Sequence, residues 1–200
     1  MPTPATLPAD IASAARAAGH WIETLNDGSH VLIRPLKPED REREAEFIRN
    51  LSPEARHFRF LCAMREATPA LLDQLMQLDY RQTMAYVALV HQNGELVEVG
   101  VSRYAVSEDE QRCECAVTVA DAWQHRGLAV ALMRHLADCA KRNGFRQMFS
   151  VDAAANEPLH ELARYLGFRA EHDPNDPAQI IHTLDLQALP DRPAQDLPPV

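Results

Sequence analysis

Apolar residues recur along the chain with two different spacings, and the change from one to the other separates predicted strands from predicted helices. Runs of β-prone residues predict strands at 21–25, 29–33, 84–91, 97–106, 112–119, 147–151 and 180–186. Helical spacing and helix-start signals predict helices at about 39–50, from 53, at 68–78, 128–142 and 156–165. The order is therefore hairpin, helices, three-stranded meander, helix, strand, helix and strand.

Turn residues indicate how these elements connect. Asn26-Asp27-Gly28 and Asn93-Gly94 are typical of tight β-hairpins, because these residue types accept a positive φ. Ser52 and Thr68, each followed by proline, are typical helix N-caps. The last meander strand, the helix after it and the next strand require a parallel crossover in an otherwise antiparallel sheet. The predicted fold class is therefore α/β, with a mixed, mostly antiparallel central sheet flanked by helices.

The length of 200 residues fits one domain, and its ends differ from its centre. We expect an N-terminal extension at 1–28 that contains the first hairpin strand, and a main domain at 29–186. A short Ala-rich stretch, Ile11–Ala18, predicts a loose helix without a functional role. Residues 187–200 are Pro-rich and predict a flexible tail.

The charge balance narrows the classes of partner. The formal net charge is -9, from 29 acidic and 20 basic residues, whereas phosphate-based nucleic-acid binding needs a basic surface. An acidic surface instead tolerates cationic partners such as amines. The chain has no secretory signal, and no apolar run approaches the ~20 residues that span a bilayer. We therefore expect a cytoplasmic protein that binds neither nucleic acid nor membrane.

Cysteine and histidine residues give no metal-binding pattern. Cys113 and Cys115 share one face of a predicted strand, and we interpret them as small buried apolar residues rather than as a metal or redox site. The nine histidines contain no ligand set with zinc-site spacing. His57, His160 and His172 are expected at the surface. The sequence therefore predicts no metal.

The junction after strand 112–119 is the strongest candidate for chemistry. The strand ends at Val119, a short polar turn follows, and a helix begins near Gln124–Gly127. The first amides of a helix have no internal partner and lie at the positive end of its dipole, and a glycine lets an anion approach them. The residues alone indicate either an anion-binding helix start or an ordinary one that contains a glycine.

Gln124-x-x-Gly127-x-Ala129 matches the Q/R-x-x-G-x-G/A motif of the GNAT superfamily of N-acetyltransferases, which the chain resembles over residues 30–186. The Val-x-Val strand end before the motif, the amphipathic helix after it, and then Asn156 and Gly167-Phe168 occur in the spacing that the family uses. Segments that look like the catalytic domain of bacterial protein lysine acetyltransferases are Arg59-Phe60, Asp79-Tyr80, 84–88 and 114–119.

The resemblance implies acetyl-CoA as the co-substrate. In the family, the strand corresponding to 112–119 splays from the next parallel strand at a bulge, and its backbone groups hold the pantetheine arm. The amides of residues 125–130 then cradle the pyrophosphate. From its charge, rather than from the resemblance, the Arg126 guanidinium is also expected to add to this site, where its backbone amide matters as much. Asn156 hydrogen-bonds the cofactor, although its place also suits a plain N-cap. The implied cofactor-binding residues are Val117, Thr118, Val119, Gln124, His125, Arg126, Gly127, Leu128, Ala129, Val130 and Asn156.

Acetyl transfer to an amine needs a proton acceptor, because a lysine amine with a pKa of ~10.4 is almost entirely charged at neutral pH. Glu114 matches the general base of the lysine acetyltransferases that the chain resembles. Its apolar neighbours are expected to raise the pKa of its carboxyl by desolvation. The alternative is a solvated strand residue paired with Arg103 or Arg112.

The chain departs from the family at the general acid. Many members carry a tyrosine seven residues after the asparagine, and that position is Ala163 here. Tyr165 lies about 200° further around the helix and is expected to serve packing rather than catalysis. A thiol is a good leaving group, since its pKa is ~8.5, so the reaction does not require the tyrosine.

Two functions follow from these expectations. The first is an enzyme that transfers acetyl from acetyl-CoA to a primary amine, with a protein lysine preferred over a small-molecule amine. The second is an acyl-CoA-binding sensor without turnover. The acceptor would lie against the helices at 50–80 and the loops at 92–112, which vary freely in this fold. The sequence leaves a homodimer open.

Overall fold

The computed structural model describes residues 19–60 and 67–190. Eight strands form one sheet in the order β1-β2-β3-β4-β5-β6-β8-β7. The strands are β1 (Trp21–Thr24), β2 (His30–Pro35), β3 (Thr83–Gln92), β4 (Glu95–Val106), β5 (Arg112–Val119), β6 (Gln147–Ala153), β7 (Arg169–His172) and β8 (Gln179–Asp185). The predicted helix Ile11–Ala18 and residues 191–200 of the predicted tail lie outside the described residues.

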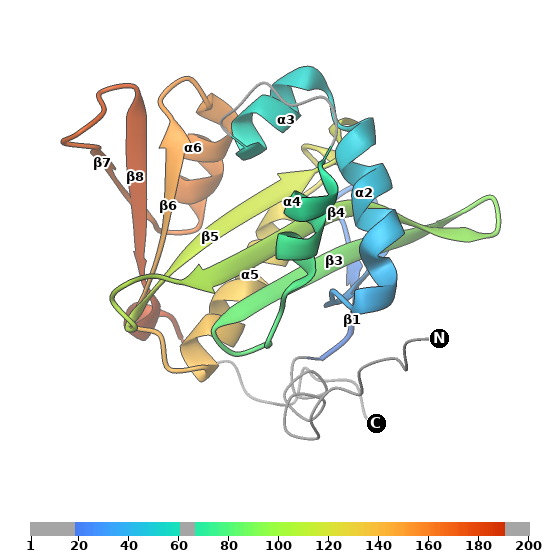
Figure 1. Cartoon of the computed structure of the whole chain (residues 1–200), viewed down its shortest axis with the longest axis horizontal. Coiled ribbons are helices and arrows are strands. Elements are labelled where there is room, and N and C mark those ends of the chain that lie inside the picture. The colour runs from blue at the N-terminus through green and yellow to red at the C-terminus, as the bar shows by residue number, and fades with distance from the viewer. Residues whose placement is uncertain (1–18, 61–66, 191–200) are drawn as a thin grey trace.

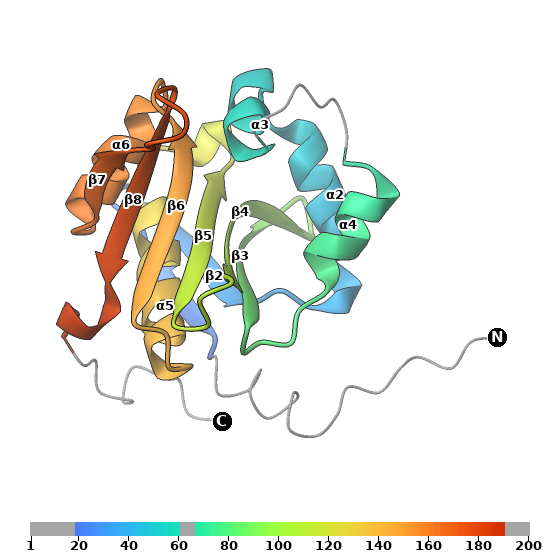
Figure 2. The ribbon, with the colours of Figure 1, turned by 60° about the vertical axis from the view of Figure 1, so that its left-hand side comes forward.

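Helices cover both faces of the sheet (Figures 1 and 2). On one face lie α2 (Arg41–Asn50), α3 (Pro53–Phe60) and α4 (Pro69–Met76). On the other lie α5 (Leu128–Arg142) and α6 (Glu157–Tyr165). Short 3-10 turns complete the elements: η1 (Pro38–Asp40), η2 (Asp121–Trp123) and η3 (Leu186–Ala188).

Strand β3 lies between two apolar cores, which explains why every side chain from Met84 to Val90 is buried. Met84 and Tyr86 point into the core shared with α5, whereas Ala85 and Val87 point into the core shared with α2 and α4. Alternate residues of a strand face opposite sides of a sheet, so a strand buried on both sides loses the alternation of polar and apolar positions. The mixed sheet between helical layers is confirmed.

The predicted connections are confirmed as well. The first hairpin, the meander β3-β4-β5 and the pair β6-β8 are antiparallel, and β5 and β6 form the predicted parallel pair. Strand β7, which pairs with β8, was not predicted. All four of its residues are exposed and three of them are polar, so it carries no apolar pattern from which a strand is read.

The edge strand β1 is fixed to α5 by its side chains. The Trp21 ring stacks on His135 at 3.9 Å between ring centroids, and His135 Nε2 lies 2.6 Å from Glu23 Oε1. The neighbouring Ile22 is 75% exposed.

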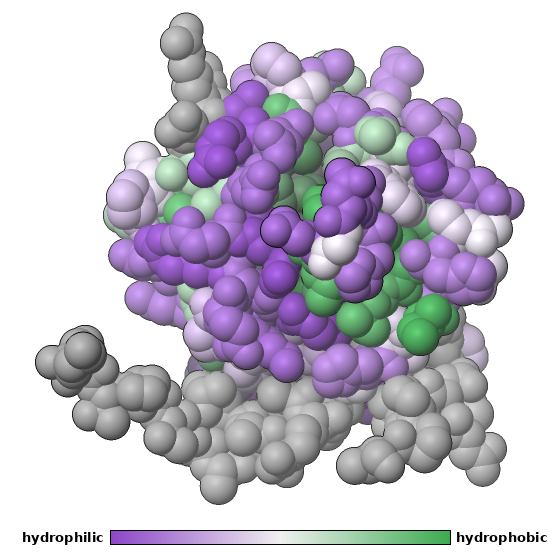
Figure 3. All heavy atoms as spheres, turned by 90° about the vertical axis from the view of Figure 1, so that its right-hand side faces the viewer, coloured by the Kyte–Doolittle hydropathy of each residue, from purple (hydrophilic) through white to green (hydrophobic). Residues whose placement is uncertain are grey.

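The face around the β3-β4 hairpin is mostly hydrophilic, with apolar side chains gathered on part of it (Figure 3). No helix among the described residues is long and apolar enough to cross a bilayer.

Candidate functional site

Strand β5 separates from β6 halfway along its length. It pairs with β4 at seven positions, from Cys113 to Val119, but with β6 only at Arg112, Cys113 and Glu114. The Ala120 amide donates to the carbonyl of Val99 in β4, at 2.9 Å. Because main-chain groups alternate between the two edges of a strand, those of Val119, and of Val117 two residues earlier, point toward the gap.

The strands open without the expected bulge in β5. Its register with β4 is continuous from end to end. The register shift in this part of the sheet lies between β3 and β4, where Ala88 pairs with Gly100 and Leu89 with Glu98, so that Val99 of β4 is the extra residue. The expectation of a bulge is therefore wrong. The β5-β6 pairing simply stops at Glu114, which puts this residue at the base of the opening.

The turn from β5 to α5 presents a row of free amides. None of the backbone amides of residues 125–130 finds an acceptor among the described residues, and the Ala131 amide is the first that binds back, to the Gly127 carbonyl at 3.1 Å. His125 and Gly127 have φ angles of 60° and 87°, which turn the chain sharply before the helix. Free amides at the positive end of a helix dipole form a site for a phosphate or another anion.

The hairpin between β1 and β2 braces this turn. The Asn26 amide donates to the Arg126 carbonyl at 3.0 Å, and Arg126 Nη1 donates to Asp27 Oδ2 at 2.8 Å. Arg126 also donates to the Ala122 carbonyl. The guanidinium is thus paired in this structure and does not line the cavity, so the added charge stays a prediction.

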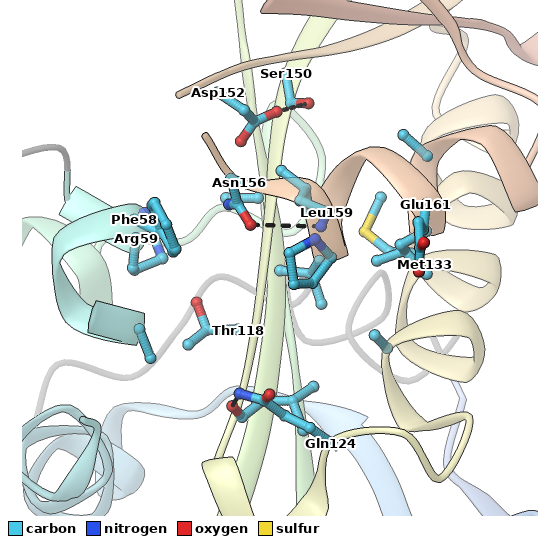
Figure 4. A pocket seen from close by; sticks show the side chains of 18 of the residues that line it. Phe58, Arg59, Thr118, Gln124, Met133, Ser150, Asp152, Asn156, Leu159 and Glu161 are labelled. Carbon is cyan, nitrogen blue, oxygen red and sulfur yellow. Dashed lines mark hydrogen bonds between the residues drawn. The ribbon is translucent and has the colours of Figure 1, made fainter. Parts of the chain in front are cut away.

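The opening between β5 and β6 continues into a cavity of about 700 Å³. Its walls come from α3, β5, the turn before α5, β6 and α6. Figure 4 shows Thr118 and Asn156 around it, with Phe58 and Arg59 from α3 on one side and Met133 from α5 on the other. The predicted cofactor-binding residues that line it are Val117, Thr118, Val119, Gln124, His125, Gly127, Leu128, Ala129, Val130 and Asn156.

Glu114 lines the same cavity, and its side chain is exposed there. It makes no hydrogen bond or ion pair with the described residues. The ion pairs considered from the sequence are absent, because Arg103 binds Glu44 at 2.7 Å and Arg112 stacks over the Phe149 ring at 4.7 Å. The expected burial of the carboxyl among apolar neighbours is wrong, because the side chain is exposed and the adjacent Cys113 and Cys115 point to the opposite face of the sheet.

Two predicted residues, Asn156 and Gln124, use their side chains within the fold, whereas Thr118 does not. Asn156 Oδ1 accepts from the Leu159 amide at 3.4 Å, so Asn156 is the N-cap of α6, while no described residue binds its Nδ2. Gln124 Nε2 donates to the Val119 carbonyl at 3.5 Å. The Thr118 hydroxyl is buried without a partner among the described residues. Asn156 can therefore cap the helix and still offer a donor to the cavity.

The two strand cysteines are confirmed as buried residues. Burial, with a contribution from Cys139, raises the pKa of Cys113 to about 12, so its thiol stays protonated. The part of the chain that the structure describes holds no group of histidine, cysteine and acidic side chains that could bind a metal ion.

The end of α6 differs from expectation. Ala163 is buried, but Tyr165 is 68% exposed at the edge of the cavity, with the Arg134 guanidinium 5.9 Å from its ring centroid. The expectation that Tyr165 serves packing is wrong, because most of its ring remains in contact with solvent.

Sequence reasoning missed a polar cluster beside the cavity. Asp152 and Ser150 on β6 line the cavity, and Asp152 binds the buried His182 of β8, which in turn binds His160 of α6. The expected surface position of His160 is wrong, since it is half-buried and bound on both ring nitrogens. An Asp between Val151 and Ala153 in β6 and a His after Ile180-Ile181 in β8 were the signals available in the sequence.

A sheet that opens beside a helix start with free amides defines a class of proteins that bind an anionic cofactor and act on it within the opening. The family model described as "Acetyltransferase (GNAT) family" matches residues 45–168. The acetyltransferase PA5475 of Pseudomonas aeruginosa is 61% identical over 175 residues, which cover 88% of this chain and 94% of that protein. The chain therefore belongs to the GNAT family of N-acetyltransferases.

Solved structures show the same fold. The GNAT domain of S. lividans PAT superposes with a TM-score of 0.76 at 22% identity, covering 90% of this chain and 99% of that one. The protein yncA of Salmonella typhimurium, solved with its cofactor acetyl-CoA, superposes with a TM-score of 0.63 at 20% identity. That match covers 82% of this chain and 99% of yncA.

Proposed function

We propose that this enzyme transfers the acetyl group of acetyl-CoA to a primary amine, preferably a protein lysine, by direct attack of the amine with Glu114 as general base. One observation carries the proposal. Glu114 is the last residue of β5 that pairs with β6, and it lines the same cavity as the free amides of residues 125–130. A proton acceptor and an anion site therefore share one opening.

The free amides fit the diphosphate of acetyl-CoA, since an anion would satisfy donors that the fold leaves unpaired. The main-chain groups of Val117 and Val119 at the open edge of β5 fit the amide groups of the pantetheine arm. Asn156 Nδ2 is a further donor for the arm. Bound in this way, acetyl-CoA supplies an activated thioester, and the protein orients it toward Glu114.

The lining of the cavity also suits a lysine side chain. Phe58 and Phe60 of α3 offer apolar contacts for an aliphatic stem, while Glu54, Asp121 and Glu161 add negative charge to the lining. The sequence resemblance to bacterial protein lysine acetyltransferases supports the same acceptor. A small polyamine is the alternative, and only the acceptor experiment separates the two.

The role of Glu114 is to take a proton from the nitrogen that attacks the thioester carbon. General base help of this kind contributes about 10²–10⁴ in rate. A thiolate leaves readily, because its pKa of ~8.5 lies far below that of an amine. The reaction therefore needs no acyl-enzyme and no tyrosine at position 163.

The experiment measures thiol release from acetyl-CoA with polylysine, free lysine and spermidine as acceptors. We expect the highest rate with polylysine and a loss of about 100-fold or more in kcat for Glu114→Gln. Glu171→Gln, an exposed carboxylate of β7 outside the cavity, is the matched control and should retain the wild-type rate. Full activity of Glu114→Gln would refute the base assignment, and a preference for spermidine would refute the protein acceptor.

A further inference from the structure

A line of hydrogen bonds runs from the cavity into the interior of the protein. Ser150 Oγ donates to Asp152 Oδ2 at 2.5 Å, and the same oxygen lies 3.1 Å from His182 Nδ1. His182 Nε2 lies 3.0 Å from His160 Nδ1, and His160 Nε2 lies 3.2 Å from the Ala154 carbonyl oxygen. Asp152, His182 and His160 are hereafter called the proton cluster. They come from three elements, β6, β8 and α6.

The number of hydrogens that these contacts need exceeds the number that the resting groups supply. A carbonyl oxygen only accepts, so the Ala154 contact requires a hydrogen on His160 Nε2, and the other two contacts of the proton cluster require one hydrogen each. Two neutral imidazoles and an ionised carboxylate supply two hydrogens for three contacts. Without a further proton, one contact would bring two lone pairs together, either His182 Nδ1 with Asp152 Oδ2 at 3.1 Å or His182 Nε2 with His160 Nδ1 at 3.0 Å. The geometry therefore favours the uptake of one proton.

The proton cluster has access to the cavity at one end only. His182 is 1% exposed, whereas the Asp152 side chain keeps 14% of its surface and lines the cavity. Asp152 Oδ1 has no hydrogen-bond partner among the described residues, while Figure 4 shows the other oxygen bound to Ser150. A proton can therefore enter through Asp152.

The charged groups that act on Asp152 come from two neighbouring elements. Arg59 of α3 interacts with both Asp152 and Glu114, and it remains cationic because burial and Arg103 lower its pKa only to about 10. Glu114 of β5 lies across the opening in the same cavity. His182 and His160 are the titratable groups on the inner side.

The proposed reaction, on which this inference rests, releases two protons from the acceptor nitrogen. An ammonium loses one proton before its lone pair can attack the thioester carbon. It loses the second after the C–N bond has formed, when the C–S bond breaks and the thiolate takes up a proton. We infer that Asp152 accepts the first proton and shares it with His182 and His160, and that Glu114 accepts the second and passes it to the thiolate.

In this scheme Asp152 is a catalytic residue, and His182 and His160 are positioning residues that act through it. Each turnover leaves one proton on the proton cluster, which returns it to solvent through Asp152, and one on CoA. Assigning the two protons to Asp152 and Glu114 also explains how the thiolate is protonated without a tyrosine at position 163. Glu114 is protonated at the moment when the C–S bond breaks.

The test combines pH-rate profiles with nitrogen NMR of isotope-labelled histidine. In Asp152→Asn, the side-chain amide donates permanently to His182 Nδ1, so the third hydrogen is present without proton uptake. With the amine of highest rate, we expect kcat/KM of Asp152→Asn to fall about 100-fold at about pH 7 and less than about threefold at about pH 10, where much of the amine is already neutral. Glu114→Gln should be impaired at both pH values.

The NMR spectra test the proton cluster without any acceptor. As the pH is lowered, His182 should change from neutral to imidazolium signals at a higher pH in the wild type than in Asp152→Asn, so that the cluster of the wild type is free to accept a proton above that pH. His160→Phe removes the contact that demands the extra proton and should shift this change to lower pH as well. The same pH for the change in all three proteins, or an equal deficit of Asp152→Asn at both pH values, would overturn the inference. If the wild type turns over no amine, the proposed function fails, while the His182 signals still decide the protonation state.

Discussion

The two edges of β5 differ in how far they pair with the neighbouring strands. Along the edge that faces β4, seven residue pairs run in one continuous register. Along the edge that faces β6, pairing stops after three residues, and the main-chain groups beyond Glu114 are left to the opening. The same backbone therefore contributes to stability on one side and to ligand binding on the other. A sheet can bind a cofactor where two strands do not pair, because the unpaired main-chain donors and acceptors there still require hydrogen-bond partners.

The comparison predicts that changes at the open edge impair binding, whereas changes at the paired edge impair folding. The largest effect is expected for Gly127→Val, because a β-branched side chain is strained at a φ of 87° and its Cβ would lie 3.1 Å from Asn26. A strain of about 1–3 kcal/mol in the turn should weaken acetyl-CoA binding by about 10–100-fold. Isothermal titration with acetyl-CoA measures this effect.

Gly94→Val is the matched control for that variant. Gly94 has nearly the same φ, 88°, but lies in the β3-β4 hairpin, where a Cβ would have no neighbour within 4 Å. It should lower the thermal midpoint without changing acetyl-CoA affinity. Equal losses of affinity in both variants would mean that backbone strain, rather than the amide turn, controls binding.

Gly100→Ala tests the paired edge. A Cβ at Gly100 in β4 would lie 3.1 Å from Leu132 Cδ1 and 3.2 Å from the Thr118 carbonyl oxygen. Such overpacking costs about 1–3 kcal/mol of unfolding free energy and should lower the thermal midpoint by several degrees. The affinity of the remaining folded protein for acetyl-CoA should stay within about twofold. A selective loss of binding would contradict the separation of the two edges.

The carboxyl of Glu98 differs from that of Glu114 in its exposure to solvent. Glu114 is exposed at the open edge, whereas Glu98 of β4 is buried, and burial raises its pKa well above 4.5, with Glu44 adding to the shift. Stability from a raised carboxyl pKa is complete below about pH 4.5 and is lost as the pH rises through the folded value. Thermal unfolding of Glu98→Gln should therefore show a smaller decline above about pH 5 than the wild type. Exposed Glu95→Gln, its control, should follow the wild type.

The smallest effect is expected at the brace of the amide turn. Asp27→Asn removes the ion pair with Arg126, which is partly exposed at both ends. A pair of this kind contributes about 0.2–1 kcal/mol, so acetyl-CoA affinity should fall by no more than about fivefold. An increase in affinity would mean that the guanidinium of Arg126, once released from residue 27, reaches the phosphates of acetyl-CoA.

Much of this arrangement could be predicted from the sequence, because local signals and global fold agree. The Val-x-Val strand end, Gly127 and the amphipathic helix after it predicted both the parallel crossover and the free amides. The pairing of Arg126 with Asp27 could not be predicted, because it joins residues 99 positions apart through the hairpin. The proton cluster was missed for the same reason, since its members lie on separate elements that only the fold brings together.

The open edge itself can be observed directly by following backbone amide signals in NMR while acetyl-CoA is added. We expect large chemical-shift changes for the amides of residues 125–130, Val117 and Val119. The changes at Ala116 and Thr118 should be small, because their amides face β4. Unchanged signals at residues 125–130 on saturation with acetyl-CoA, or equal shifts along both edges of β5, would contradict this expectation.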